Sequence, residues 1–281
     1  MKQTIRRCMR RPLSLFAKLI TTLAAAATML TLLAIVGYIL VRGIPHLKPS
    51  LFAWTYTTEN VSLMPAIATT LMMTLTALLL AVPFGIFTAV YLVEYARRGS
   101  RIVGVIRMTA ETLSGIPSIV YGLFGMLFFV TALHWGLSLL SGAVTLAIMI
   151  LPLVMRTTEE ALLAVPDAYR EASFGLGAGR LRTVFRVVLP AATPGILAGV
   201  ILAIGRIVGE TAALIYTAGT VAKIPESLFA SGRTLALHMY ALSSDGLHID
   251  ESYATAVVLL ALVVLINAAS TSLGRRLTKG Q

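Results

Sequence analysis

The chain has 281 residues, of which 57% are hydrophobic and only 12% are charged, and its mean hydropathy is +0.87. Water-soluble domains carry about one quarter charged residues, so this composition excludes an ordinary soluble protein and makes lipid the solvent for most of the chain. The formal charge is +11, but the basic residues do not form a stripe with aromatic residues between them. This excludes the usual nucleic-acid-binding surface. The single cysteine, Cys8, excludes an intramolecular disulfide or a multi-cysteine metal site.

Five segments without charge predict the membrane-spanning helices, because about 20 apolar residues cross a hydrocarbon core. In chain order they are residues 19–41, 60–93, 112–155, 187–205 and 252–274. The second becomes apolar after Pro65, the third is long enough for two helices and breaks at residues 134–136, and the fourth continues past Arg206 to about Tyr216. The sequence therefore predicts an all-α, polytopic membrane protein with six transmembrane helices.

The first span follows a basic segment, residues 1–18, and resembles a secretory signal in having alanines at 24–27. Its apolar stretch continues beyond those alanines and exceeds the length of a signal core. We therefore expect residues 19–41 to be a retained helix. The other five helices form a core domain over residues 65–273, and residues 157–190 are its longest polar interruption.

The distribution of Lys and Arg predicts the orientation, because basic residues concentrate on the cytoplasmic side of a membrane protein. They gather in residues 2–18, 97–107, 156–186 and 275–279, all on one predicted side. The other side has only Arg42, Lys48, Lys223 and Arg233. We expect a multi-pass protein of the bacterial inner membrane with both termini in the cytoplasm, so most of the positive charge reports topology.

The polar interruption at 157–190 has the pattern of a short helix, a glycine turn and a second helix. Pro166 and Asp167 suit the first positions of a helix, and Gly175, Gly177 and Gly179 end it. A second helical stretch at 181–188 then meets the next span. A basic loop resting on anionic headgroups is the simpler alternative, but the order of residues favours a compact knob in the cytosol.

The same segment resembles the EAA motif of ATP-binding-cassette importer permeases, with Val187 in place of the usual isoleucine. The other matching residues are Glu171, Ala172, Ser173, Gly177, Leu189 and Pro190. Ser173 stands where the family has alanine. The resemblance implies that this loop is the coupling helix, which docks on a cytoplasmic ATPase and transmits its closure to the membrane helices.

Enzyme chemistry is not indicated. The chain has no Gly-x-x-x-x-Gly-Lys-[Ser/Thr] phosphate loop, no nucleophile elbow and no His-Glu-x-x-His pattern. We expect no cofactor, and ATP hydrolysis by another polypeptide. Acidic and histidine residues gather in the last predicted external loop, at about 219–251, without the spacing of a metal site. We predict that they form a docking surface for a binding protein or a solvated loop. These residues are His238, Asp245, His248, Asp250 and Glu251.

Two charged residues interrupt the fourth of the uncharged segments, which is the fifth predicted helix. A charge inside the membrane is unfavourable in free energy. Arg206 and Glu210 are four apart, so on one helix they share a face. They are either a mutually neutralising structural pair or part of a substrate pathway, in which Arg206 attracts an oxyanion through its planar fork and Glu210 holds the guanidinium. Arg107 and Glu111 have the same spacing near the cytoplasmic boundary and are predicted to form a structural bridge.

The pattern Arg206-x-x-Gly-Glu-Thr-Ala-Ala, together with residues 114–125, is similar to the phosphate-specific branch of these permeases. Residues 65–67, 82–86 and 91–95 are similar to its A-type subunit. The resemblance implies a heterodimer with a second homologous permease, an ATPase pair, an external phosphate-binding protein, and a phosphate pathway that includes Ser118, Arg206, Glu210 and Thr211. The alternatives are another oxyanion, such as sulfate or molybdate, and a stand-alone secondary transporter, against which the EAA-like loop argues.

Overall fold

The computed structural model describes residues 12–97 and 99–279, and these residues form helices and no strands. Most of the basic segment at 1–18, Cys8 included, lies outside the described residues, as does Arg98. The longer helices are α2 (Pro12–Gly43), α3 (Met64–Val90), α4 (Arg101–Ser114), α5 (Ser118–Gly125), α6 (Leu139–Leu163), α7 (Asp167–Gly175), α9 (Leu189–Val208), α11 (Leu235–Asp245) and α12 (Ile249–Lys279). The short helices are η1 (Ile44–His46), η2 (Pro49–Phe52), α8 (Arg180–Thr183) and α10 (Ala212–Thr217). Three π-helical turns, η3 (Tyr91–Tyr95), η4 (Met126–Ala132) and η5 (Val184–Val188), adjoin α3, α5 and α9.

The helices confirm an all-α membrane protein. Five helical segments are long and apolar enough to cross a bilayer, and a sixth span results if one bent helix pair is counted with them. The break expected at residues 134–136 is present between η4 and α6, where His134 and Gly136 both have positive φ. Hydropathy therefore located the apolar helices, and the exception is the course of the third span.

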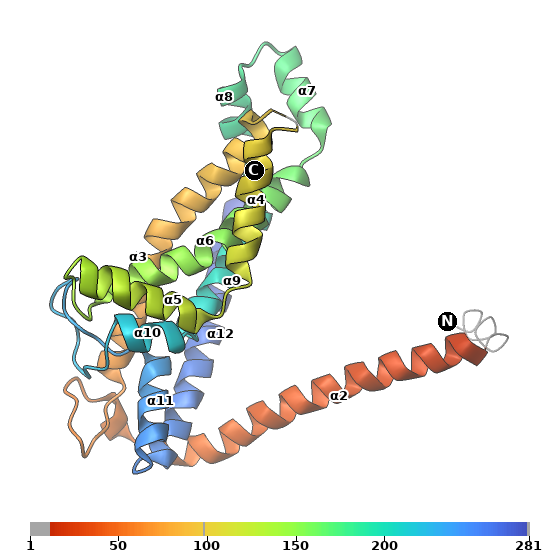
Figure 1. Ribbon diagram of the computed structural model, residues 1–281. Coiled ribbons are helices and arrows are strands. Elements are labelled where there is room, and N and C mark those ends of the chain that lie inside the picture. Colours follow the sequence, from red (N-terminus) through yellow and green to blue (C-terminus); the bar gives the residue numbers. More distant parts are fainter. Residues whose placement is uncertain (1–11, 98, 280–281) are drawn as a thin grey trace.

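The third span differs from the expected straight helix. Residues 101–114 are already helical as α4, and the chain then bends by 100° into α5 and η4. Pro117 has no N–H to continue the helix of α4, and the Tyr121 hydroxyl donates to the carbonyl of Leu113 across the bend at 2.8 Å. The bend makes this segment a broken span or a re-entrant loop, with α4 upright and α5 lying across the molecule (Figure 1).

The core lies between α3, α6 and α9 (Figure 1). Met73 of α3 and Leu146 and Ile150 of α6 are completely buried, and Ile207 of α9 packs against the same cluster. A second cluster joins η3, the end of α6, and η5, close to α7. These two clusters make one continuous support from the middle of the membrane domain to the loop between α6 and α9.

Helix α2 leaves this core. None of its most apolar 18-residue window is buried within the chain, and Figure 1 shows the helix running away from the other elements. It meets them only near its end, where Gly43 lies against the backbone of Tyr253 in α12. The ring of Tyr38 packs edge-on against the ring of Tyr253. The apolar surface of α2 is consequently available to lipid or to another subunit.

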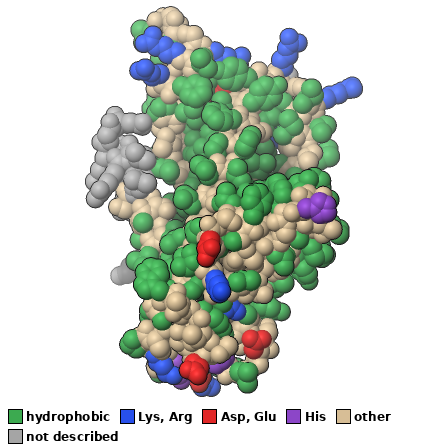
Figure 2. Space-filling model, turned by 90° about the vertical axis from the view of Figure 1, so that its left-hand side faces the viewer, with side chains coloured by type: hydrophobic (Ala, Val, Ile, Leu, Met, Phe, Trp, Pro, Cys, Tyr) green, Lys and Arg blue, Asp and Glu red, His purple; other side chains and the backbone are tan. Residues whose placement is uncertain are grey.

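The two ends of the molecule differ in charge. Figure 2 shows hydrophobic side chains over most of the visible face and basic side chains gathered at the end where α7 and α8 lie. The opposite end, formed by α11, η1 and the start of α12, mixes acidic, basic and histidine side chains. We refer to these as the α7–α8 end and the α11 end.

Candidate functional site

The loop between α6 and α9 has the helix–turn–helix form that its residues predict. α7 begins at Asp167 directly after Pro166 and ends at Gly175, and α8 with η5 leads without a break into α9. Gly177 has a φ of +81°, the left-handed conformation that only glycine adopts without strain. The turn therefore depends on the glycine at this position.

Ser173, the departure from the family's alanine, has a specific contact. Its hydroxyl oxygen lies 2.9 Å from that of Thr183 in α8, and both residues are buried. The backbone N–H of Ala178 donates to the Ser173 carbonyl across the same turn. These bonds hold α7 against α8, so the loop is one compact unit.

This unit presents some of the motif residues and packs others. Glu171 and Ala172 are exposed on α7, where a partner can reach them. Leu189 is half-buried and packs on the cluster that contains Val184 and Val188. Pro190, also half-buried, follows in the first turn of α9. The loop therefore combines an exposed helix with a packed junction to the membrane domain.

A buried ion pair connects α7 to the end of α3. Nη2 and Nε of Arg170 lie 2.7 and 3.1 Å from Oε1 of Glu94, which is 76 positions earlier in the chain. The same guanidinium donates to the carbonyls of Leu162 and Val165 at 3.0 and 2.8 Å, and to Asp167 at 3.2 Å. Arg170 thus ties together η3, the end of α6 and α7.

A cavity of about 490 Å³ lies beside this ion pair, between η3, α4, α7 and α8. Its charged lining is dominated by arginine. The charged residues are Arg97, Arg107, Arg170, Arg180, Glu94 and Asp167. Arg180 also lies 5.3 Å from the ring centroid of Tyr95. The space under the α7–α8 loop is therefore polar and basic.

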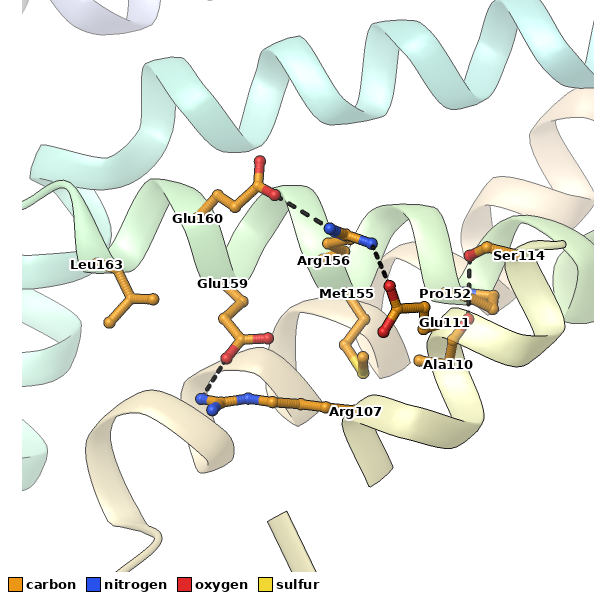
Figure 3. Close-up of a pocket in the computed structure, with 10 residues that line it drawn as sticks. All are labelled: Arg107, Ala110, Glu111, Ser114, Pro152, Met155, Arg156, Glu159, Glu160 and Leu163. Carbon is orange, nitrogen blue, oxygen red and sulfur yellow. Dashed lines mark hydrogen bonds and ion pairs between the residues drawn. The ribbon is translucent and has the colours of Figure 1, made fainter. Parts of the chain in front are cut away.

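Arg107 and Glu111 do not form the predicted spacing-four bridge. Arg107 pairs instead with Glu159 of α6 at 2.5 Å, and Glu111 lies 3.9 Å from Arg156, also of α6 (Figure 3). The intrahelical prediction is wrong because α4 packs against α6, which offers each charge a partner across the helix interface.

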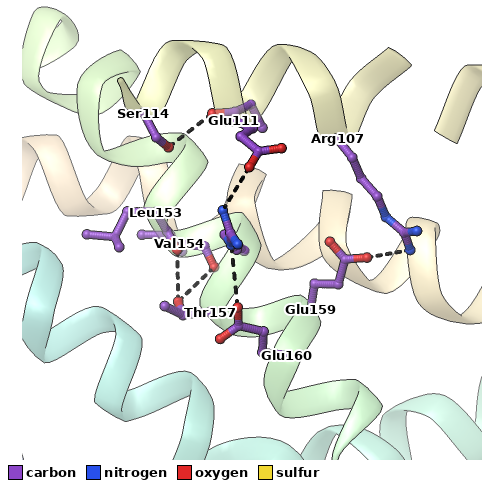
Figure 4. Close-up of polar contacts among 10 residues, drawn as sticks. Arg107, Glu111, Ser114, Leu153, Val154, Thr157, Glu159 and Glu160 are labelled. Atoms are coloured by element: carbon purple, nitrogen blue, oxygen red, sulfur yellow. Dashed lines mark hydrogen bonds and ion pairs between the residues drawn. The ribbon is translucent and has the colours of Figure 1, made fainter. Parts of the chain in front are cut away.

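These cross-helix pairs surround a cavity of about 310 Å³ between α4 and α6. Arg156 also reaches Glu160 at 3.4 Å. Figure 4 shows the neighbouring Glu159 and Glu160 pointing to different partners, so two consecutive acids of α6 serve two separate contacts. Charged pairs thus add to the apolar contacts of α4 with α6 here.

The predicted Arg206–Glu210 pair is also wrong. α9 ends at Val208 with Gly209 as its cap, so the two residues do not share a helical face, and no ion pair joins them in the described chain. Glu210 instead accepts a hydrogen bond from the backbone N–H of Ala213 at 3.1 Å, in the first turn of α10. A carboxylate satisfies free N–H groups at such a position.

Arg206 itself is exposed and lines a groove of about 560 Å³ between α6, α9 and α12. The other polar side chain of that lining is Asn267, whose Oδ1 is buried without a hydrogen-bond partner. Arg206 is therefore free of any carboxylate partner among the described residues and open to a mobile anion.

Ser118 and Thr211 stand at matching ends of neighbouring helices. α5 and α10 lie together near mid-height of the molecule (Figure 1). A Cβ on Gly122 would come within 2.8 Å of Ala213, and one on Gly125 would clash with Thr217, so the two helices run parallel. Ser118 is the first residue of α5, and Thr211 is the N-cap of α10, directly after Glu210.

The acidic and histidine residues of the last outer loop do not gather as one cluster. Asp250 pairs with His46, and Glu251 lies near Lys48 and His248 at 3.9 and 3.7 Å. No group of three or more His, Cys, Asp or Glu side chains suited to a metal ion occurs in the described residues. These pairs attach the segment after α2 to the start of α12.

His238 has a different environment. It is completely buried in α11, edge-on to Tyr56, and neither ring nitrogen has a hydrogen-bond partner. Burial, and secondarily the nearby charge of Arg233, lowers the pKa of His238 to about 3. The imidazole is therefore neutral at physiological pH.

Comparison with known proteins agrees with this architecture. Residues 81–280 match the family described as "Binding-protein-dependent transport system inner membrane component". The chain belongs to this permease family. Its fold is thus that of a multi-pass inner-membrane transport component, a class of subunit that works with a separate ATPase.

Three curated relatives match over most of the permease. It is 37% identical to the "Probable ABC transporter permease protein YqgI" of Bacillus subtilis, over 72% of this chain and 74% of the relative. It is 38% identical to the phosphate transport system permease protein PstA 1 of Mycobacterium tuberculosis, over 69% and 64% of the two chains. It is 31% identical to the phosphate transport system permease protein PstC of Mesorhizobium japonicum, over 76% and 72%.

Solved structures of bacterial importers share the fold of the permease. A transporter for the acidic polysaccharide alginate aligns with a TM-score of 0.68 and 15% identity over 98% of this chain and 99% of that one. The MetNI methionine ABC transporter aligns with a TM-score of 0.59 and 22% identity over 86% and 98%. At these identities the likeness concerns the backbone arrangement.

Sequence reasoning missed the side chains that anchor the permease's coupling loop. Glu94 was noticed only as part of the resemblance at residues 91–95, and Arg170 only as one of the basic residues of its side. The available signal was the acid itself, since a glutamate at the end of an apolar helix needs a partner if it is buried. Sequence could not say that the partner is Arg170.

Proposed function

We propose that this chain is a channel subunit of an ATP-driven importer of inorganic phosphate. The observation that carries the proposal is the 36–38% identity to relatives named phosphate transport system permease protein PstA. The groove at Arg206 supports it, because an arginine without a carboxylate partner suits an oxyanion. Sulfate and molybdate are the alternatives that a direct test must exclude.

The chain hydrolyses no ATP in this proposal, and it works with three kinds of partner. A pair of cytoplasmic ATPases docks at the exposed face of α7, a homologous second permease completes the channel, and an external phosphate-binding protein delivers the substrate. The similarity to a PstC-named relative as well as to PstA-named ones supports a heterodimer. The α7–α8 end and both termini then face the cytoplasm, as the basic residues predict.

Phosphate passes the starts of α5 and α10 on this reading. Arg206 attracts the anion, and Ser118 and Thr211 offer hydroxyl groups at the starts of α5 and α10. Glu210 keeps its carboxylate on the N–H of Ala213, so it shapes the entrance to α10 and leaves the guanidinium unpaired. A site built from one cation and neutral donors binds an oxyanion weakly enough to release it.

ATPase closure moves the coupling loop as one body. Glu171 and Ala172 make the contact, Gly177 keeps the turn, and the Arg170–Glu94 ion pair passes the movement to η3 and α6. The direct junction of η5 with α9 passes it to the helix that carries Arg206. The loop and the pathway are thereby linked through continuous helices.

Purification of the chain with its ATPase, followed by ATP hydrolysis and uptake in proteoliposomes across a panel of phosphate, sulfate and molybdate, tests the proposal. Phosphate with its own binding protein should stimulate both activities. Stimulation by sulfate or molybdate alone would identify that anion as the substrate in place of phosphate. Transport without any ATPase would exclude an ATP-driven importer.

The substitution Arg206→Gln tests the pathway. We expect uptake of phosphate to fall at least tenfold, the loss expected when a charged hydrogen bond is removed, while the complex still assembles. Glu210→Gln, which keeps a hydrogen-bond acceptor for Ala213, should have a smaller effect. Normal uptake per assembled Arg206→Gln complex would exclude contact between Arg206 and phosphate.

A further inference from the structure

Arg233 occupies a rigid position at the α11 end. Its backbone N–H donates to the carbonyl of Val221 at 3.1 Å. Directly after it, Thr234 caps α11, and the N–H of Leu235 donates to the Thr70 hydroxyl of α3 at 2.8 Å. The segment before α11 is thus fastened on both sides of Arg233, and its side chain is only 7% exposed.

The buried guanidinium has no counter-charge. No carboxylate lies within 4.0 Å of it in the described residues, and its Nε is enclosed without a hydrogen-bond partner. Its contact is the face of Tyr56, 5.1 Å from the ring centroid. His238, which packs on the edge of the same ring, is neutral at physiological pH and supplies no negative charge.

An isolated charge is unfavourable in a protein interior unless it is paired. A cation–π contact compensates only part of the lost hydration. Among the described residues no carboxylate lies close enough to form an ion pair with Arg233, which leaves its charge open to an anionic partner.

We propose that Arg233, stacked on Tyr56, is an oxyanion-binding position on the external side of the channel, separate from Arg206. This inference rests on the proposed function and names a second residue for the same substrate. A guanidinium binds phosphate through two parallel hydrogen bonds, and the contact with the ring of Tyr56 helps to hold the side chain in place. Of the guanidinium nitrogens only Nε is enclosed without a partner, so the Nη groups reach the surface and can donate to a small inorganic ion.

The experiment uses the complete complex in nanodiscs and radiolabelled inorganic phosphate as the probe, without the binding protein. Arg233→Met keeps the length of the side chain and its packing on Tyr56 but removes the charge, and Arg233→Lys keeps the charge without the planar fork. Arg42→Met is the matched control, because Arg42 also lies over a tyrosine, Tyr38 at 5.9 Å, but is exposed.

We expect phosphate affinity to fall about tenfold or more in Arg233→Met and about threefold in Arg233→Lys. The Arg42→Met complex should match the wild type. The melting temperatures of all assembled complexes should agree within a few degrees. If Arg233→Met does not assemble, Arg233→Lys decides, and wild-type phosphate affinity in that variant would overturn the proposal.

Two other results would also overturn it. Equal losses in Arg233→Met and Arg233→Lys, accompanied by lower melting temperatures, would assign Arg233 a structural role. Unchanged phosphate affinity, together with weaker docking when the binding protein is added to the same nanodiscs, would assign it a protein partner. A wild-type complex that carries another oxyanion and not phosphate would instead refute the proposed function, so the two failures are distinguishable.

Discussion

Arg170 shows how one residue can hold a helix of the α7–α8 loop to the rest of the protein. Its side chain is 14% exposed and that of Glu94 is 8% exposed, so the pair is largely shielded from water. Removing one partner of a buried pair leaves the other charge uncompensated, which destabilises a protein by about 3–5 kcal/mol. The carbonyls of Leu162 and Val165 would remain as acceptors for Arg170, but they carry no full charge.

Glu94→Gln should therefore uncouple the importer. We expect ATP hydrolysis to continue while substrate uptake per ATP falls several-fold, because α7 loses its charged link to η3. Both rates are measured on the same proteoliposomes. Glu160→Gln is the control, because Glu160 is an exposed acid whose single partner among the described residues is Arg156. Wild-type stoichiometry in Glu94→Gln would contradict a role of this pair in coupling.

His238 makes stability depend on pH. Its folded pKa of about 3 lies below the ordinary value of 6.5, so the unfolded chain takes up a proton first as the pH falls. The stability that the neutral imidazole provides is complete above pH 6.5 and is lost progressively below it. At pH 5 the loss is about 2 kcal/mol. The melting temperature of the complex should fall less between pH 7.5 and pH 5 in His238→Gln than in the wild type. In His134→Gln, where the histidine is exposed, the fall should equal that of the wild type.

At the scale of elements, the glycine turn controls the direction of α7 relative to α8. Gly177 needs its left-handed backbone, and the space around it is open, so any effect of a side chain there comes from backbone strain alone. Left-handed backbone disfavours a branched residue by about 1–3 kcal/mol. Gly175 has equally open surroundings but an ordinary φ.

Gly177→Val should abolish ATP-driven uptake without affecting membrane insertion or binding to the second permease. Gly175→Ala should transport like the wild type, because alanine is a good helix former at a helical position. Uptake and the amount of assembled complex are measured for both. Normal ATP-driven transport by Gly177→Val would refute the assignment of this loop to coupling.

The contact of α4 with α6 is a second device at this scale. Arg107 is 49% exposed and Glu159 11% exposed, and their ion pair joins α4 to α6. Arg107→Glu should reduce the assembled, active complex, and the exchange Arg107→Glu with Glu159→Arg should restore much of it. The same exchange at the exposed pair Arg156 and Glu160 should change little. Failure of the first exchange to restore activity would show that the two side chains do not act together.

At the scale of the whole molecule, the proposed orientation puts the α7–α8 turn and the α11–α12 turn on opposite sides of the membrane. Leu176 is 90% exposed in the first turn and Leu247 is 84% exposed in the second. In a Cys8→Ser background, a membrane-impermeant thiol reagent should label Leu247→Cys in intact cells. Leu176→Cys should react only after the cells are opened, and the reverse pattern would invert the topology.

Much of the permease could be predicted from sequence because the deciding features are local. Apolar length located the spans, and Pro166, Asp167 and the glycines at 175–179 located α7 and its turn. The coupling-loop motif resembled a known family, and the family match covers residues 81–280. The 100° bend after α4 was missed, although Pro117 was visible, because a proline in an apolar segment marks a break without stating its angle.

The partners of the charged residues were decided only by tertiary structure. Spacing alone paired Arg206 with Glu210 and Arg107 with Glu111, and both pairings are wrong: α9 ends before Glu210, and α6 offers Arg107 a closer acid. Arg170 meets a glutamate 76 positions away. Hydropathy and turn chemistry act between neighbours in the chain, so sequence by itself determined the helices and the helix–turn–helix form of the α7–α8 loop. An ion pair depends on how distant helices pack, and so only the fold determined which charges are neutralised and which remain available to an anion.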